Sequence, residues 1–374
     1  MNEREVAELR RRFKPERNSF GKIKGCYVNE LGHIASRFEQ SLAMMSQDET
    51  ELLLGVLRKT LSGTLEKNLV NLSFETGQVA YGEEHKLLRT LRDSELKDED
   101  AVETFFQKVS DSVQMEGGYL ILLVCDAYDV PRRRGEEPAE DSGEVYRYIL
   151  CSICPVAETK PALSYYMREN EFHNRQMNQL VSAPALGFLF PAFDDRAANL
   201  YGALCYTKDP AQSHEEFIQA VFHTQAPMPA AAQRENFQAA LAGSLEKDSS
   251  YEVVQAVHGQ LREMIAVHKE SKEQEPLTLT KGQMAGVLRS CGVAPEHTQA
   301  FTDRFDETFG PDAQVSPRNL IDTGKVEVRT PDVVVQVNPE RGDLVRTEMI
   351  QGCKYIMIRV DGEVEVNGVE IHIG

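Results

Sequence analysis

The stretch from Tyr119 to Cys125 constrains the fold of this chain most, because all seven of its residues are apolar or aromatic. An unbroken apolar run of this length is typical of a strand covered on both faces, since a strand with one solvent face alternates with polar residues. A buried helical segment is the alternative. The short length of the run and the preceding Gly117-Gly118 pair favour the strand.

A second β-rich stretch, residues 145–154, is predicted to pair with this strand as a hairpin. The connection at 129–138 combines arginines and acidic residues with prolines and a glycine, so it is too polar and too interrupted to pack. Its Arg132-Arg133-Arg134 run is basic, but Glu136 and Glu137 follow closely. We expect a solvated, self-neutralising loop at the tip of a central strand pair.

The composition of the chain bounds its class. A length of 374 residues exceeds one average domain, and a hydrophobic content of 41% suffices for a sizeable core. The formal charge of −18 argues against general binding to nucleic acid or anionic lipid, although a local basic patch could still bind either. The first residues lack the apolar core of a signal peptide, and no apolar run approaches the ~20 residues that span a bilayer. We therefore expect a cytosolic protein without membrane contact.

The order of periodic segments predicts an α+β fold in three parts. Residues 1–226 are expected to form an α+β domain with a mixed or antiparallel sheet and flanking helices, and its residues 164–174 an irregular or helical piece. Residues 227–275 are expected to be a helical segment ending in a charged linker. Residues 276–374 are expected to form a second α+β domain, in which a helix pair precedes a β-meander.

A basic segment follows the first predicted helix, at residues 2–13. Residues 1–24 hold eight Lys or Arg against four Asp or Glu, a local excess in an acidic protein. Cations that complement the helix dipole on a solvated face are one interpretation, and contact with an anion or nucleic acid is the other. The candidate anion-binding residues are Arg10, Arg11, Arg12, Lys14, Arg17, Lys22 and Lys24.

The trio Asp194-Asp195-Arg196 is the most enzyme-like pattern in the chain, because it ends a dense apolar stretch. The alternative is a turn whose carboxylates cap the next segment and pair with Arg196, and this structural interpretation is favoured. Motifs for nucleotide binding or for a serine nucleophile are absent from the sequence. No catalytic residue and no cofactor is therefore predicted.

Seven cysteines scattered along the chain favour reduced thiols over a disulfide framework. Cys151 and Cys154 form a CxxC pattern, but residues three apart on a strand point to opposite faces, so their sulfurs diverge. A redox CxxC begins a helix, and a zinc site needs a second ligand pair. His214 does not begin a zinc-protease motif, since Ile218 stands where the second histidine would be. No metal site is predicted.

Five motifs carry a resemblance to a known family. They are RRRFKPE at 10–16, GCYV at 25–28, GFLFPAFDDR at 187–196, SPRN at 316–319 and VNPER at 337–341. Over essentially its full length the chain resembles a family of cytosolic proteins from Gram-positive, Firmicutes-type bacteria that is known only as a domain of unknown function. The resemblance implies no activity, because none is assigned to the family.

A more distant resemblance is one of element order. A helix precedes the Gly-Gly-aromatic strand at 117–119, a second apolar strand follows at 148–154, and a helix pair and meander occupy 277–366. This order is similar to that of the bacterial nucleoid-associated protein family of about this size. It implies a nucleoid-linked, dimeric, non-enzymatic protein in the cytosol. The charged central loop is longer here, and that family's DNA-contacting residues are not transferred.

Three functions remain as hypotheses. The first is a non-catalytic binding protein of nucleoid-associated type, which contacts DNA or a DNA-bound partner through the segment Arg10–Lys24. The second is a protein–protein adaptor that uses an acidic surface and the C-terminal strands. The third is an enzyme with a carboxylate site at Asp194 and Asp195. A protein partner and a homodimer are further expectations.

Overall fold

The computed structural model describes residues 1–131, 145–159, 162–175, 179–246, 249–271, 275–366 and 368–372. The chain forms two compact units, Met1–Pro229 and Ala230–Gly374. The division into 1–226, 227–275 and 276–374 stays a prediction. The Arg132-Arg133-Arg134 loop lies outside the described residues.

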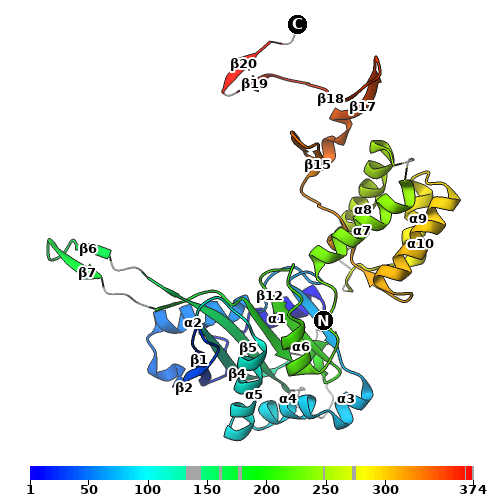
Figure 1. The fold of residues 1–374 in the computed structure, drawn as a ribbon. Coiled ribbons are helices and arrows are strands. Elements are labelled where there is room, and N and C mark those ends of the chain that lie inside the picture. The colour runs from blue at the N-terminus through cyan, green and yellow to red at the C-terminus, as the bar shows by residue number, and fades with distance from the viewer. Residues whose placement is uncertain are drawn as a thin grey trace. The chain divides into compact units, whose positions relative to one another are not determined.

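One antiparallel sheet, in the order β2-β1-β4-β5-β9-β12-β3, forms the centre of the first unit, and β8 pairs in addition with β5 (Figure 1). Its central strands are β4 (Tyr119–Asp129) and β5 (Val145–Glu158), which pair from Tyr119 opposite Pro155 to Asp129 opposite Val145. The predicted α+β class and central strand pair are confirmed. Both strands continue four residues beyond the predicted arms.

The remaining elements of this unit complete the sheet and cover it. They are α1 (Glu3–Arg10), β1 (Lys22–Val28), β2 (Ile34–Ser41), the 3-10 helix η1 (Leu42–Met44), α2 (Gln47–Lys59), β3 (Leu69–Ser73), α3 (Thr76–Tyr81), α4 (Glu83–Asp93), α5 (Glu99–Ser112), β6 (Ala162–Tyr166), β7 (Glu171–Arg175), β8 (Gln179–Val181), β9 (Leu186–Phe190), β10 (Ala192–Asp194), β11 (Ala197–Asn199), β12 (Gly202–Thr207) and α6 (Glu215–Phe222).

Helices cover both faces of the sheet, so alternate side chains of β4 enter two different cores. Ile121 and Leu123 are buried in a core with residues of α4, α5 and α6. Leu122 and Val124 are buried in a second core with residues of α1 and α2. This cover explains why the run in β4 is apolar without alternation.

Strands β6 and β7 form a two-stranded sheet of their own (Figure 1). The prediction of an irregular or helical piece at 164–174 is therefore wrong. The hairpin turns at 167–170. The short run gave no clear period, whereas cross-strand pairing such as that of Tyr165 with Phe172 defines the strands.

The second unit has a helical core. Its helices are α7 (Ala230–Leu245), α8 (Tyr251–Ser271), α9 (Lys281–Ser290), α10 (Pro295–Phe309) and α11 (Pro317–Leu320), and β13 (Leu279–Thr280) pairs with β14 (Gln314–Val315). Phe237, Leu261, Met284 and Phe301 are buried together. The helices expected in the middle segment and the expected helix pair thus share one core.

The C-terminal strands pair as three separate hairpins. These are β15 (Val326–Arg329) with β16 (Val334–Val337), β17 (Val345–Ile350) with β18 (Cys353–Ile358), and β19 (Val364–Val366) with β20 (Val369–Ile371), while the 3-10 helix η3 (Pro339–Leu344) precedes β17. Within the described residues no strand pairs from one hairpin to the next, so the expected single meander is replaced by hairpins. Gln351 and Gly352 have φ of 52° and 80°, as a tight type I′ hairpin turn requires.

Candidate functional site: the basic segment, its pocket and an apolar arm

The basic segment runs from the last turn of α1 to β1, and three of its seven candidate cations are held by carboxylates. Lys22 Nζ lies 2.5 Å from Glu39. Lys24 Nζ lies 3.6 Å from the other oxygen of Glu39 and also pairs with Glu99. Arg12 pairs with Asp126 at 3.3 Å. These charges are neutralised within the chain.

The other four candidates are available to a ligand. Among the described residues, the side chains of Arg10, Arg11, Lys14 and Arg17 make no ion pair and no hydrogen bond. Arg11, Lys14 and Arg17 are exposed, and Arg10 is partly buried. The backbone turns tightly here, because the carbonyl of Lys14 accepts hydrogen bonds from the amides of Arg17 and Asn18 at 3.0 Å. This places Arg11, Lys14 and Arg17 on one short loop, directly after Arg10 at the end of α1.

Asp126 anchors the inner end of the basic segment. Its side chain is 2% exposed and accepts hydrogen bonds from Arg12, from the Ser19 hydroxyl and, at 2.8 Å, from Tyr148. The Arg12 guanidinium also lies 4.9 Å from the centre of the Tyr128 ring. A buried carboxylate needs such donors, and here they tie the loop after α1 to strands β4 and β5.

The tyrosine in this network stays protonated. Burial, followed by the adjacent carboxylate of Asp126, raises the pKa of Tyr148 well above its usual value of 10.0. Tyr146 stacks on the Tyr148 ring with a centroid distance of 5.0 Å. The hydroxyl of Tyr148 therefore acts as a hydrogen-bond donor at neutral pH and not as a base.

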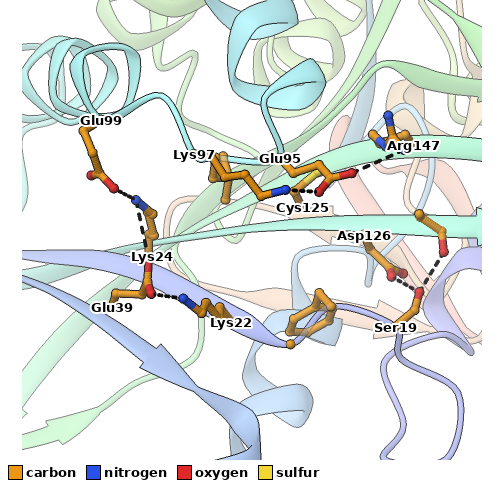
Figure 2. Close-up of a pocket in the computed structure, with 14 residues that line it drawn as sticks. Ser19, Lys22, Lys24, Glu39, Glu95, Lys97, Glu99, Cys125, Asp126 and Arg147 are labelled. Carbon is orange, nitrogen blue, oxygen red and sulfur yellow. Dashed lines mark hydrogen bonds and ion pairs between the residues drawn. The ribbon is translucent and has the colours of Figure 1, made fainter.

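A pocket of about 610 Å³ lies beside Asp126 (Figure 2). Its charged lining consists of four cations and four carboxylates: Lys22, Lys24, Lys97, Arg147, Glu39, Glu95, Glu99 and Asp126. Figure 2 shows all of these groups except Asp126 paired with one another, as where Glu95 lies 2.8 Å from Lys97 and 3.3 Å from Arg147, while Asp126 is bonded to Ser19. The lining has no excess of either sign, so a charged ligand would have to replace existing ion pairs.

Cys125 contributes a thiol to the wall of the pocket. Burial raises its pKa to about 12, with smaller effects from neighbouring charges. The thiolate is the nucleophilic form of cysteine, and it is scarce at neutral pH in such a site. The thiol instead lies 3.7 Å from the carbonyl of Arg92, to which it donates. Its surroundings favour a structural role.

The trio Asp194-Asp195-Arg196 forms the turn between β10 and β11, and Asp195 and Arg196 have φ of 50° and 62°. Asp194 accepts a hydrogen bond from Asn199 at 2.6 Å and lies 2.5 Å from the amino group of Met1. The expected turn is present. Asp195 is exposed, which favours a structural turn over a carboxylate site.

The expected pairing of the turn's carboxylates with Arg196 is wrong. Arg196 instead pairs with Glu8 at 2.9 Å, because α1 packs against β10 and brings Glu8 within reach. Tyr128 donates to the same carboxylate at 2.7 Å. Burial acts to raise the pKa of Glu8, but the hydrogen bonds from Arg196 and Tyr128 outweigh it and hold the pKa below its usual value.

The two CxxC cysteines and His214 are packed as structural residues. Cys151 lies in the core beside α4, α5 and α6, and Cys154 lies in the core beside α1 and α2, so the predicted divergence of the CxxC sulfurs is confirmed. His214 Nε2 lies 3.0 Å from the Thr207 hydroxyl. In the described ranges no three His, Cys, Asp or Glu side chains are grouped to hold a metal ion.

The hairpin of β6 and β7, here called the β6–β7 arm (residues 162–175), carries an exposed apolar face. Tyr165 lies opposite Phe172, with ring centroids 5.3 Å apart, and Leu163 lies two residues away on the same face. Leu163 and Phe172 are 73% and 67% exposed. Met167 in the turn is 85% exposed. This surface was not predicted from the sequence, because the short run at 162–175 has no clear period.

Together these features define a two-unit α+β protein with an antiparallel sheet between helical layers. Within the described residues, no helix is long and apolar enough to cross a membrane. The chain belongs to the family DUF4317, a domain of unknown function, whose sequence model matches residues 1–369. This confirms the full-length family resemblance. No curated protein matches the chain, and the resemblance to nucleoid-associated proteins stays a prediction that these comparisons do not support.

Proposed function

We propose that this protein is a non-catalytic, cytosolic binding protein and that it docks onto another protein through the apolar face of the β6–β7 arm. The exposure of Leu163, Tyr165 and Phe172 on one face of a two-stranded hairpin carries the proposal. Such a hairpin is marginally stable in water by itself, and clustered exposed apolar side chains mark interaction sites. Aromatic residues are enriched in the buried centres of protein interfaces.

The partner should present an apolar groove or sheet surface to this face. The opposite face of the arm is more polar, since His173 lies 2.9 Å from Glu169 and meets the Tyr166 ring edge to face, with centroids 4.9 Å apart. An interface formed through the apolar face would therefore have an apolar centre, and the more polar opposite face would lie at its rim. This arrangement is typical of transient contacts between proteins.

Affinity capture from a lysate of the source organism tests the proposal. The baits are the full chain, the arm variant Leu163→Ser/Phe172→Ser, and the control Leu180→Ser, which changes an exposed leucine of β8 outside the arm. We expect the full chain and the control to capture the same partner after nuclease treatment. With that partner purified, the arm variant should bind at least tenfold more weakly. Equal binding by all three would refute docking through the arm.

Direct contact with DNA is a second candidate, which the unpaired cations Arg10, Arg11, Lys14 and Arg17 favour. Four phosphate contacts predict a slope of about −3.6 in log K against log salt, or a loss of roughly a hundredfold between ~50 and ~200 mM salt. Fluorescence anisotropy of labelled duplex DNA, titrated with the protein at several salt concentrations, measures this slope.

The matched variants are Arg11→Gln/Lys14→Gln/Arg17→Gln and Lys22→Gln. The triple change should abolish most of the salt dependence, whereas Lys22 is already neutralised by Glu39 and its change should leave the slope intact. Absence of binding at ~50 mM salt would exclude direct contact. An enzymatic role at Asp194 and Asp195 stays a prediction to which the contacts of the turn add no support.

A further inference from the structure

Strand β2 is an unusual edge for this sheet. It ends the strand order, and its residues 35–40 are all exposed, although Arg37 forms an ion pair with Glu103 of α5. Long exposed edge strands are templates for pairing with another strand, and natural proteins usually shorten, twist or cover them. Here the edge is eight residues long.

The hydrogen-bond phase of β2 follows from its junction with η1. The amide of Leu42 donates to the carbonyl of Gly21 at 2.9 Å, and the register continues as Lys22 opposite Ser41. Bonded pairs alternate along an antiparallel ladder, so Phe38 is bonded to Gly25 in β1. The residues between bonded positions direct their N–H and C=O groups away from β1. These outward residues are Arg37, Glu39 and Ser41, because a register shift between Ile34 and Ser36 interrupts the alternation at Ala35.

We propose that β2 pairs with β2 of a second copy of this chain, antiparallel about a twofold axis at Phe38. In this register Arg37 lies opposite Glu39 of the second copy, and the reciprocal pair forms on the other side of the axis. Arg37 is already bonded to Glu103 through Nε and Nη2, and Glu39 to Lys22 and Lys24, so the cross-copy pairs would join these existing ion pairs. Arg37 and Glu39 then meet outward residues of the second copy, so the bonding phases of both strands agree around the axis. The proposal does not depend on the β6–β7 arm or on DNA.

Charge selects this register over its neighbours. A twofold axis at residue 37 would oppose Arg37 to itself, and an axis at residue 39 would oppose Glu39 to itself. Like charges directly opposite destabilise an antiparallel pair, whereas opposite charges stabilise it. Charged residues on an edge usually discourage pairing, but one cation and one anion flanking a central residue are self-complementary under twofold symmetry.

The centre of the proposed interface is aromatic. The Phe38 ring covers Gly25, where an added Cβ would fall 2.4 Å from the ring, so the ring is fixed against the sheet. Phe38 is still 36% exposed. A non-hydrogen-bonded pair brings side chains closest together, so the two Phe38 rings would meet at the axis and remove apolar surface from water.

Cysteine cross-linking tests the register without altering Phe38. In the proposed dimer Ser36 lies opposite Gln40 of the second copy, within the spacing that a disulfide bridges. Two Ser36 residues would be about 13 Å apart, which is too far. The test uses Ser36→Cys and Gln40→Cys in the full chain, both with Cys353→Ser because Cys353 is exposed.

An equimolar mixture of the two variants should form a disulfide-linked dimer under mild oxidation, and neither variant alone should do so. Cross-linking of either variant alone to the same extent, or none in the mixture, would overturn the register. Sedimentation equilibrium gives the second measurement, from a monomer of 42.0 kDa. Arg37→Glu should raise the dimer Kd roughly tenfold or more, and Arg37→Glu/Glu39→Arg should recover part of that loss, since the swap also removes the pairs of Arg37 with Glu103 and of Glu39 with Lys22.

The control for these charge changes is Arg58→Glu on the exposed surface of α2, which alters net charge equally. Circular dichroism confirms that each variant is folded. An unchanged dimer Kd in Arg37→Glu, or equal weakening by Arg58→Glu, would refute pairing through β2. A wild-type chain that stays at monomer mass at ~100 times the concentration used for cross-linking would refute the dimer itself.

Discussion

Replacement of Asp126 by asparagine should destabilise the first unit by about 3 kcal/mol. The carboxylate is 2% exposed and accepts hydrogen bonds from Arg12, Ser19 and Tyr148. Asparagine keeps one acceptor oxygen but turns an N–H₂ group toward donors, so at least one buried donor loses its partner. Breaking a buried ion pair costs about 3–5 kcal/mol, and the partial exposure of Arg12 (17%) places the expectation at the lower end.

Urea unfolding followed by far-UV circular dichroism measures this effect, because the chain has no tryptophan. For a unit of this size, about 3 kcal/mol corresponds to a fall of roughly 6–12 °C in Tm. Asp129→Asn is the matched control, since Asp129 is exposed on the same strand and its change should cost less than about 0.5 kcal/mol. Tyr148→Phe removes one donor and should cost about 1 kcal/mol. Equal stability of Asp126→Asn and Asp129→Asn would refute the anchoring role of Asp126.

Two further predictions concern titration. With iodoacetamide at pH 8, exposed Cys353 should be alkylated at least a hundredfold faster than Cys125, whose pKa is raised by burial to about 12; similar rates in a mass-spectrometric time course would contradict this. Burial, with a smaller effect from Arg262, lowers the pKa of His258 to about 4, so the unfolded state binds more protons below pH 6.5. The stability of the second unit should be full above pH 6.5 and fall by on the order of 2–3 kcal/mol toward pH 4. His258→Gln should flatten that dependence in thermal unfolding measured across this range.

The central strands were predictable because period and packing agree there. The apolar run of β4 predicts cover on both faces, and the two-residue period of β5 places Cys151 and Cys154 in different cores. The ends of these strands were not predictable. Asp126 follows the apolar run directly and signals its end in sequence, yet it is buried, because Arg12 supplies a donor from 114 residues away.

The charges of the candidate site show the same limit. The cations at 10–24 are close together along the chain, and this proximity does predict that they lie in one region of the surface. It does not predict which of them are neutralised. Lys24 in β1 pairs with Glu99 of α5, and Arg196 pairs with Glu8 of α1 rather than with the adjacent aspartates. These distances are set by the fold and not by the spacing along the chain. A basic cluster in an acidic chain is therefore evidence for anion binding only if its cations are not paired with carboxylates elsewhere in the fold. Here four of the seven cations have no such partner among the described residues.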